Sequence, residues 1–250
     1  MPQPLKLLGV KVDRATMEET IDAVKALIRS HERRGRYLCV ANVHSVVCSR
    51  RNEKIKAVMN ASWLTVADGM PLLWSAGLLG CPIKERVAGP DLMTNLLGVS
   101  EKEGFKNFFY GSSDAVLTAL SKNLTERFPR LRIVGAIAPP FRPLTPAQDL
   151  EIVEAIHAAS PDILWVGLGA PKQELWMAEH SGRLRVPVMI GVGAAFDFHA
   201  GHKSRAPLWM QKSGLEWAWR LYQEPGRLWK RYLIDDLPFF WYILKQKYIG

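Results

Sequence analysis

The sequence predicts an α/β fold: a Rossmann-like parallel sheet with helices on both faces, followed by a helical C-terminal appendage. Short apolar segments alternate with helical patterns up to about residue 192, as in βαβ units. Several of these segments run directly into glycine or a polar residue, as buried parallel strands do at their carboxyl ends. From about residue 203 the alternation stops, and aromatic and basic residues dominate. We therefore divide the chain into residues 1–202 and an appendage at 203–250.

Each element follows from a local signal. Thr16 and Glu19 form a capping box before a helical apolar pattern. Pro71 suits the first turn of the helix that follows Asp68-Gly69, and Thr145 can cap a helix through residue 157. One charged helix is expected between the second and third strands. The expected strands are residues 5–12 (a short strand or lead-in), 37–41, 63–67, 107–110, 131–136, 163–168 and 188–192.

Composition limits the possible classes of protein. The 250 residues are 48% apolar and 23% charged, which is typical of a soluble globular protein. The net charge of +9 favours an anionic partner. Cys39, Cys48 and Cys81 show no metal-binding spacing, and their odd number indicates a reducing compartment. Because no apolar run reaches the ~18 residues of a membrane span and no signal peptide is visible, we expect a cytoplasmic protein, at most peripheral on the inner membrane face.

Two glycine turns follow the strands at 163–168 and 188–192, and they predict a ligand site. Gly169 and Gly193 permit sharp turns and close approach of a ligand. The helix that opens near Lys172 and Gln173 presents N–H groups suited to phosphate. Phe196 could stack on a base, and Asp197 could bind a base or a sugar hydroxyl. The alternative is that glycine only fits the turns; neither cluster is a complete G-x-G-x-x-G fingerprint.

Asp68 and Arg86 are the other candidates near strand ends. Asp68 follows a buried strand and precedes Gly69, so its carboxylate could accept a proton from an attacking hydroxyl. The alternative is an N-cap, which position alone favours. Arg86 could bind a diphosphate, or could be a solvated charge or a member of an ion pair. Polar residues after neighbouring parallel strands, among them Asn42, are expected at one edge of the sheet. No metal pattern and no D-x-D motif is present.

The tail, residues 203–250, carries nine Lys/Arg against four Asp/Glu and eleven of the 24 aromatic residues. Its helical pieces are interrupted at Pro225 and Pro238. Tryptophan, tyrosine and cationic residues are typical of a bilayer interface, so we favour a membrane-facing role. The alternative is a helical cap packed on the sheet. A nucleic-acid site is not expected, because no such motif is visible. Arg220, Arg227 and Arg231 could close over an anionic substrate.

Six segments, taken together and in this order, resemble the WecG/TagA/CpsF glycosyltransferase family (glycosyltransferase family 26). They are VANVHSV at 40–46, VADGMPLLW at 66–74, RVAGPDL at 86–92, GLGAPKQE at 167–174, GVGAAFDFHAG at 191–201 and RAPLWMQKSGLEWAWRLYQEPGRLWKRY at 205–232. The resemblance implies an inverting, metal-independent enzyme without a cofactor. It implies transfer of an N-acetylmannosamine-type sugar or a related hexose or uronic acid from a UDP-sugar to a polyprenyl-diphosphate-linked saccharide at the cytoplasmic membrane, in bacterial surface polysaccharide synthesis.

The resemblance also implies roles for single residues. Asp68 matches the family's proposed general base, and Asn42 matches the asparagine of the pocket motif. Gln173 matches a donor-sugar contact, Arg86 an arginine near the diphosphate, and Asp197 with its glycine turn the nucleotide side. The tail matches an appendage that docks on the membrane and completes the site with arginines. Many members carry threonine where this chain has Val40, which affects the donor sugar more than the reaction class.

Two alternatives stay open on the residues alone. The first is a nicotinamide-dependent oxidoreductase on the same sheet, against which the missing dinucleotide fingerprint counts. The second is a non-catalytic peripheral membrane module of the polysaccharide machinery, which would need the tail but not Asp68 or Gln173. The protein could also form a homo-oligomer; the sequence does not specify the oligomeric state.

Overall fold

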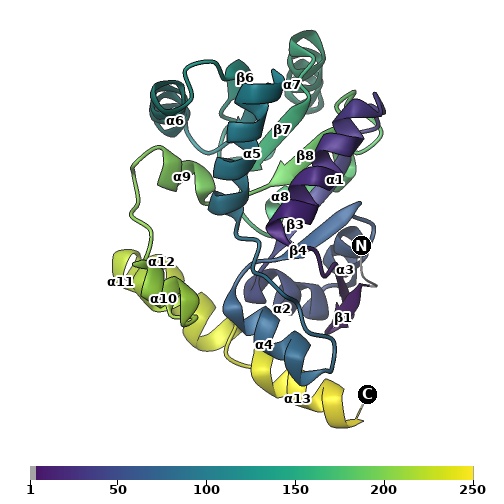
Figure 1. Cartoon of the computed structure of the whole chain (residues 1–250), viewed down its shortest axis with the longest axis vertical. Coiled ribbons are helices and arrows are strands. Elements are labelled where there is room, and N and C mark those ends of the chain that lie inside the picture. Colours follow the sequence, from purple (N-terminus) through teal and green to yellow (C-terminus); the bar gives the residue numbers. More distant parts are fainter. Residues whose placement is uncertain (1–3, 250) are drawn as a thin grey trace. The chain divides into compact units, whose positions relative to one another are not determined.

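The structure, a computed structural model, describes residues 4–249 (Figure 1). The chain divides into two compact units: unit 1 comprises Met1–Glu19, Val40–Ala88 and Ser204–Gly250, and unit 2 comprises Thr20–Cys39 and Gly89–Lys203. The strands are β1 (Leu5–Leu7), β2 (Val10–Val12), β3 (Arg36–Ala41), β4 (Leu64–Ala67), β5 (Lys106–Gly111), β6 (Arg132–Ile137), β7 (Ile163–Gly167) and β8 (Val188–Gly191).

Helices occupy most of the remaining chain. Those before the tail are α1 (Met17–Arg29), α2 (Val43–Arg51), α3 (Glu53–Asn60), α4 (Met70–Leu78), α5 (Gly89–Glu103), α6 (Asp114–Arg127), α7 (Pro146–Ala159), α8 (Lys172–His180) and α9 (Ala195–His199). The tail contains α10 (Leu208–Lys212), α11 (Glu216–Gln223), α12 (Pro225–Lys230), the π-helical turn η1 (Arg231–Asp235) and α13 (Phe239–Ile249).

The main sheet confirms the predicted fold class. Its six strands lie in the order β4-β3-β8-β7-β5-β6, and the pairs β3–β8, β8–β7, β7–β5 and β5–β6 are parallel. The six predicted strands that form this sheet agree with the observed ones to within a residue or two at each end. The central strands are almost wholly buried, which is why they read as continuous apolar runs.

The structure confirms the predicted capping residues of three helices. Thr16 and Glu19 exchange hydrogen bonds between side chain and backbone, with distances of 2.9 and 3.2 Å, at the start of α1. Thr145 and Gln148 form a second capping box on α7, and Pro71 occupies the first turn of α4. Cys39 is fully buried in β3, where it is a small residue of the core.

Two elements differ from the prediction. Residues 5–12 form an antiparallel hairpin, because Leu8 and Gly9 both adopt positive φ (51° and 86°), the backbone of a two-residue hairpin turn. The single charged helix after β3 is two helices, α2 and α3. The break lies at Asn52, whose side chain accepts hydrogen bonds from the N–H groups of Lys54 (2.9 Å) and Ile55 (3.3 Å) and so caps the second helix.

Within unit 1, the tail is docked by polar contacts at several points. The side chain of Gln246 accepts from the N–H of Leu8 and donates to the carbonyl of Lys6, both at 2.8 Å, so α13 is fastened to the hairpin. The guanidinium of Arg50 lies 4.4 Å from the ring centroid of Tyr242. The tail therefore has a defined position on the helices and hairpin of unit 1 (Figure 1).

Candidate active site

Two backbone hydrogen bonds bring three predicted site residues together in unit 1. Asn42 follows β3, and Asp68 follows β4. The N–H of Asp68 donates to the carbonyl of Ala41 at 2.7 Å, which aligns the two strand ends. The N–H of Val87 donates to the carbonyl of Ala67 at 2.9 Å, which places the Arg86 loop at the same end. This is the edge of a parallel sheet at which ligands bind.

A cavity of about 290 Å³ lies at this edge, and Asn42, Asp68 and Arg86 all line it. The rest of its wall comes from residues 43–44, 69–71 and a set of tail residues between 211 and 240. The volume is near the lower end of small-molecule sites, about 300–1,000 Å³. The tail thus forms a large part of the wall around Asp68.

Asp68 is not the N-cap that position favoured. The N-cap of α4 is Gly69, whose φ of 104° is a value that glycine adopts readily. No side chain caps that helix. The Asp68 carboxylate instead lines the cavity. Burial and, next, the nearby charge of Glu216 raise its pKa to about 6, against the opposing effect of Arg86, Arg220 and Arg205. A carboxylate with this pKa is ionised at neutral pH and is still a competent base.

The Asn42 side chain caps helix α2. Its Oδ1 accepts from the N–H of Ser45 at 3.0 Å, and the Ser45 hydroxyl accepts from the N–H of Asn42 at 2.9 Å, which is a capping box at the start of α2. The Nδ2 amide is the donor that Asn42 can offer to a ligand in the cavity. Val40, two residues earlier, is a buried residue of β3.

Arg86 is held by two tail residues. Its Nη1 donates to Glu216 Oε2 at 2.8 Å, and its Nη2 donates to Gln211 Oε1 at 3.1 Å. The same Gln211 oxygen accepts from Arg205 Nη2 at 2.8 Å. Arg86 is therefore not a solvated surface charge: only 14% of its side chain is exposed.

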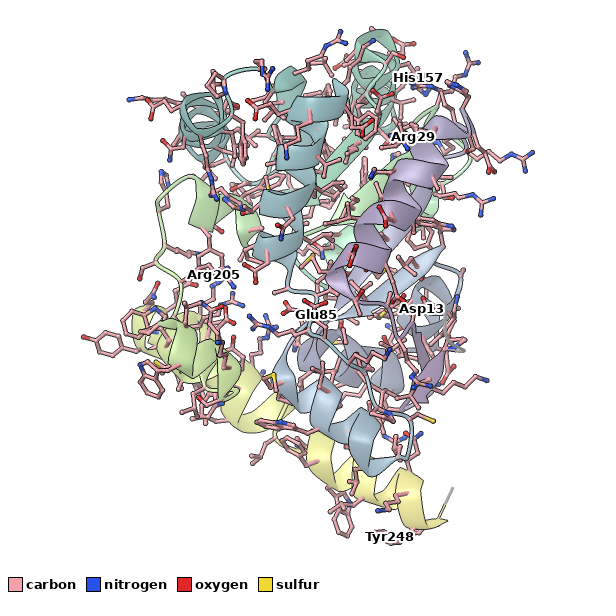
Figure 2. All side chains as sticks on the ribbon, in the orientation of Figure 1. Asp13, Arg29, Glu85, His157, Arg205 and Tyr248 are labelled. Carbon is pink, nitrogen blue, oxygen red and sulfur yellow. The ribbon has the colours of Figure 1, made fainter. Side chains whose placement is uncertain are left out.

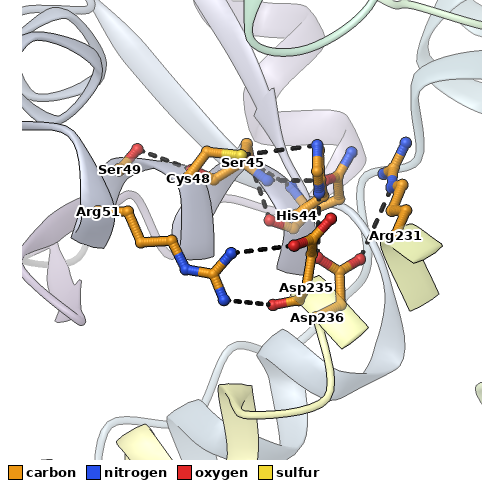
Figure 3. Close-up of polar contacts among 9 residues, drawn as sticks. His44, Ser45, Cys48, Ser49, Arg51, Arg231, Asp235 and Asp236 are labelled. Atoms are coloured by element: carbon orange, nitrogen blue, oxygen red, sulfur yellow. Dashed lines mark hydrogen bonds and ion pairs between the residues drawn. The ribbon is translucent and has the colours of Figure 1, made fainter. Parts of the chain in front are cut away.

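His44 also lines the cavity and connects α2 to the tail (Figure 3). Its Nδ1 lies 3.0 Å from Asp236 Oδ1, and its Nε2 lies 3.6 Å from Cys48 Sγ. Burial alone would lower the His44 pKa, but hydrogen bonds to Asp236 and Cys48 outweigh it and raise the pKa to about 9. The imidazole is thus cationic at neutral pH. Arg51 and Asp235 form a second ion pair nearby, at 3.1 Å.

The three predicted tail arginines separate into two groups. Arg220 and Arg231 line the cavity. Arg231 Nε lies 3.6 Å from Asp236 Oδ2, so this arginine shares the carboxylate that His44 contacts. Arg227 pairs instead with Glu224 at 2.7 Å, and 60% of its side chain is exposed. The structure therefore brings Arg220 and Arg231, with Arg86, to the wall around Asp68.

The predicted glycine turns lie in unit 2, where they surround Gln173. Gly169 (φ 79°) and Gly193 (φ 54°) both adopt backbone that favours glycine. A Cβ on Gly193 would lie 3.6 Å from Gln173 Oε1 and 3.9 Å from Gly169 Cα, so the three residues are neighbours. Gln173 is only 3% exposed, and its Nε2 donates to Glu174 Oε1 at 3.0 Å, while its buried Oε1 accepts no hydrogen bond from the described residues.

The remaining unit 2 candidates differ in exposure. Lys172 is exposed at the start of α8. Asp197 Oδ2 lies 3.4 Å from Lys203 Nζ and is partly exposed. Phe196 is fully buried, with its ring edge-on to Phe109 at 5.7 Å. This burial argues against the expected stacking of Phe196 on a base, because a fully buried ring offers no face to a ligand.

Exposed aromatic and aliphatic side chains extend along the tail. They include Trp209 (63% exposed), Trp241 (67%) and Tyr248 (73%), and Figure 2 labels Tyr248 near the end of the tail. Trp74 of α4 is half exposed, and its ring lies against the tail at Gly214, where an added Cβ would touch it. Among the described residues, no helix is long and apolar enough to cross a bilayer, and no group of three or more His, Cys, Asp or Glu could hold a metal ion.

The sequence pattern did not indicate several polar residues of the cavity wall, among them Gln211, Glu216, Asp236 and His44. His44 carried a usable signal, because it lies two residues after a strand end. The other three contact partners about 125–190 residues away in the chain. No local pattern reports such a contact.

The sequence of this chain is similar to known proteins along almost its whole length. The sequence model of the "Glycosyl transferase WecG/TagA/CpsF family" matches residues 5–250. Two relatives, from Staphylococcus aureus strains MW2 and NCTC 8325, are each named N-acetylglucosaminyldiphosphoundecaprenol N-acetyl-beta-D-mannosaminyltransferase. Each is 28% identical to this chain over 243 residues, which cover 96% of this chain and 92% of the relative.

Proposed function

Because the chain belongs to the WecG/TagA/CpsF family of glycosyl transferases, we propose that it transfers a sugar from a UDP-sugar to a polyprenyl-diphosphate-linked saccharide in the synthesis of a surface polysaccharide. The names of the relatives favour an N-acetylmannosamine-type donor and an N-acetylglucosamine acceptor sugar on undecaprenyl diphosphate. We further propose that transfer inverts the anomeric carbon and needs no metal ion.

One observation carries the mechanism: a carboxylate with no capping role lines a cavity whose wall also holds arginines. Asp68 removes the proton from the acceptor hydroxyl as its oxygen forms a bond to the anomeric carbon of the donor. The bond from that carbon to the UDP oxygen breaks, and UDP leaves with the electron pair. The pKa of about 6 keeps Asp68 ionised and ready to accept this proton at neutral pH.

The leaving diphosphate gains negative charge as the bond breaks, and fixed cations stabilise that charge. Arg86, Arg220 and Arg231 of the cavity wall are suited to this role, since a guanidinium binds phosphate oxygens bidentately. A divalent cation does the same work in other transferases. The arginines therefore support a reaction in which protein side chains supply the positive charge.

We assign recognition of the donor to unit 2 residues, following the resemblance to the family. Gly169 and Gly193 expose backbone, Gln173 has an unused buried acceptor oxygen, and Asp197 is partly exposed. The valine at position 40, buried in β3, cannot donate the hydroxyl hydrogen bond that threonine would. We expect this substitution to affect the choice of donor sugar. Membership of the family favours a transferase over an oxidoreductase or a non-catalytic module.

The test of the base is Asp68→Asn. An amide cannot accept the proton, so we expect turnover to fall by about 10²–10⁴-fold while UDP binding is kept. Wild-type activity should rise with pH through about 6, the pKa of Asp68. The measurement is UDP release on addition of acceptor. Asp22→Asn, on the exposed face of α1, is the matched control; near-normal turnover of Asp68→Asn would exclude Asp68 as the base.

Stability provides the folding control for this variant. Because burial raises the Asp68 pKa from 3.8 to about 6, ionised Asp68 destabilises the folded state, and this cost appears as pH rises between those two values. Asp68→Asn should therefore be more stable than wild type at pH 7, on the order of 2 kcal/mol, and equal to it below about pH 4. Thermal unfolding at the two pH values checks both signs.

The donor and metal requirement are tested together. Wild-type protein is incubated with a panel of UDP-sugars and a short-chain prenyl-diphosphate N-acetylglucosamine, with and without EDTA. Acceptor-dependent UDP release from one donor, unchanged by EDTA, is the expected result. Loss of release with EDTA, restored by a divalent cation, would contradict metal independence but leave the transfer itself intact.

We also propose that the tail docks on the inner face of the cell membrane. The exposed Trp209, Trp241 and Tyr248 are residues that settle at a bilayer interface, and the net positive charge of the tail favours anionic lipids. This arrangement would hold the enzyme where its lipid-linked acceptor is found. The tail also lines the cavity, so truncation after residue 204 would remove both functions at once.

Point substitutions separate the two functions. Trp209→Ser with Trp241→Ser should weaken binding to phosphatidylglycerol-containing vesicles by about 10-fold or more, because each exposed aromatic ring adds apolar burial at the interface. Activity on a water-soluble acceptor should be unchanged. The matched control is Phe141→Ser in unit 2, where the side chain is 92% exposed. Equal vesicle binding by the double variant and wild type would contradict the tail as the docking surface.

A further inference from the structure

We propose that Glu216, the first residue of α11, is a positioning residue that holds the Arg86 guanidinium in the wall of the cavity containing Asp68. The inference rests on the proposed transferase function. It gives the tail a part in catalysis that is separate from any contact with a membrane.

The contacts of Arg86 define its orientation at both ends of the guanidinium. Nη1 donates to Glu216 Oε2 at 2.8 Å, and Nη2 donates to Gln211 Oε1 at 3.1 Å. The side chains of Arg86 and Glu216 are 14% and 23% exposed, so the pair is largely removed from solvent. Two acceptors on separate residues fix the plane of a guanidinium, which is what directed binding of phosphate oxygens requires.

The second acceptor is itself fixed. Gln211 is buried, and its Nε2 donates to the carbonyl of Ala206 at 2.7 Å. Its Oε1 accepts from both Arg86 and Arg205. Gln211 therefore holds two guanidiniums with one oxygen, and Glu216 adds a negative charge to the arrangement.

Glu216 is placed by a close contact between the tail and α4. Gly214 has a φ of 73°, and a Cβ at this position would lie 2.5 Å from the ring of Trp74 and 3.2 Å from Met70 Cβ. The N–H of Leu215 then donates to the carbonyl of Met210 at 2.8 Å. Glycine is needed here, both for the backbone and for the contact, and α11 begins two residues later at Glu216.

Glu216 also adds a negative charge near Asp68, and this effect gives the proposal a distinct readout. Burial is the largest cause of the raised Asp68 pKa, and the charge of Glu216 is the second. Arg86, Arg220 and Arg205 lower this pKa. Removing the Glu216 charge should therefore lower the Asp68 pKa. The other charged groups in the cavity wall, which remain in every variant, are His44, Arg231 and Asp236.

The experiment compares Glu216→Gln with Glu216→Ala on a water-soluble acceptor, without vesicles. Glutamine still accepts from Arg86 but has no charge. We expect it to keep most of kcat at pH 8 and to move the acid limb of kcat/KM down by about half a pH unit or more. Alanine releases Arg86, and kcat should fall by about 10-fold or more with a smaller change in KM, because Arg86 acts on charge that develops in the transition state.

Glu224→Gln is the matched control, because Glu224 pairs with Arg227 away from the cavity. It should change neither the limb nor kcat. The proposal is overturned if Glu216→Ala has wild-type kcat, or if Glu216→Gln leaves the acid limb in place. A carboxyl ¹³C titration of Asp68, assigned with Asp68→Asn, does not depend on turnover. In Glu216→Gln this titration should show the same lowering of the Asp68 pKa, even if no UDP-sugar proves to be a donor. A failure of the proposed function can therefore be distinguished from a failure of this inference.

Discussion

The ends of β3 and β4 in unit 1 and the ends of β7 and β8 in unit 2 are both followed by predicted site residues, but the two regions are built differently. In unit 1 the site is a cavity whose charged side chains are paired with residues far away in the chain, such as Arg86 with Glu216. In unit 2 each strand ends in a glycine, Gly167 or Gly191, that lies against an apolar side chain, and a second glycine follows in the turn.

The difference separates two reasons why glycine follows a strand in this sequence. A Cβ on Gly167 would lie 2.5 Å from the Phe196 ring, and one on Gly191 would lie 2.7 Å from Met177 Cε. These glycines serve packing, whereas nothing lies within 4 Å of a Cβ on Gly169. In unit 1, by contrast, the chemistry depends on charges whose positions are set by the docked tail.

The largest expected effect tests the packing role of the glycines in unit 2. Gly167→Ala should destabilise the protein by about 3 kcal/mol, because the Phe196 ring is fully buried and cannot move aside without cost. Gly169→Ala meets no neighbour and should cost only about 1 kcal/mol, from its φ of 79°. Chemical denaturation of the two variants gives the comparison.

Affinity should show the opposite order if Gly169 approaches the donor. UDP binding by calorimetry should weaken for folded Gly169→Ala more than for Gly167→Ala under conditions where both are native. Equal stability losses in the two variants would remove the distinction between packing and ligand glycines.

A smaller effect tests the ionic docking of the tail in unit 1. The raised pKa of His44 means that its cationic form stabilises the folded state; this stabilisation is complete below the ordinary value of 6.5 and is lost as pH rises through about 9. His44→Ala should therefore cost on the order of 2 kcal/mol at pH 6 and much less at pH 10. Denaturation at both pH values measures it.

Asp236→Asn should reproduce this pH dependence, because Asp236 is the carboxylate that His44 contacts. His202→Ala, an exposed histidine in unit 2, is the matched control and should cost little at either pH. A loss for His44→Ala that is the same at pH 6 and pH 10 would show that the imidazole acts only by packing.

Much of the fold could be predicted, because its signals are local. Buried parallel strands appear as apolar runs, and the capping boxes at Thr16 and Thr145 need only residues three apart. The hairpin turn at Leu8-Gly9 was missed because leucine rarely adopts a positive φ. The break at Asn52 was missed because a charged stretch with continuous helical spacing conceals a cap in its middle.

The site was predicted in part for the same reason. Asn42, Asp68 and Arg86 lie just beyond strand ends or in a loop fixed to one, so the strand pattern identified them. The N-cap interpretation of Asp68 and the stacking role of Phe196 followed sequence position alone. Backbone geometry at Gly69 and burial of the Phe196 ring argue against them.

The sequence by itself determined the sheet, the order of its elements and membership of a transferase family, because strand periodicity, caps and ordered motifs are properties of neighbouring residues. Only the tertiary structure decided which charges meet: Glu216 with Arg86, Asp236 with His44, and the tail with the hairpin. The strength of such a contact depends on distance and burial, and neither quantity is encoded by separation along the chain.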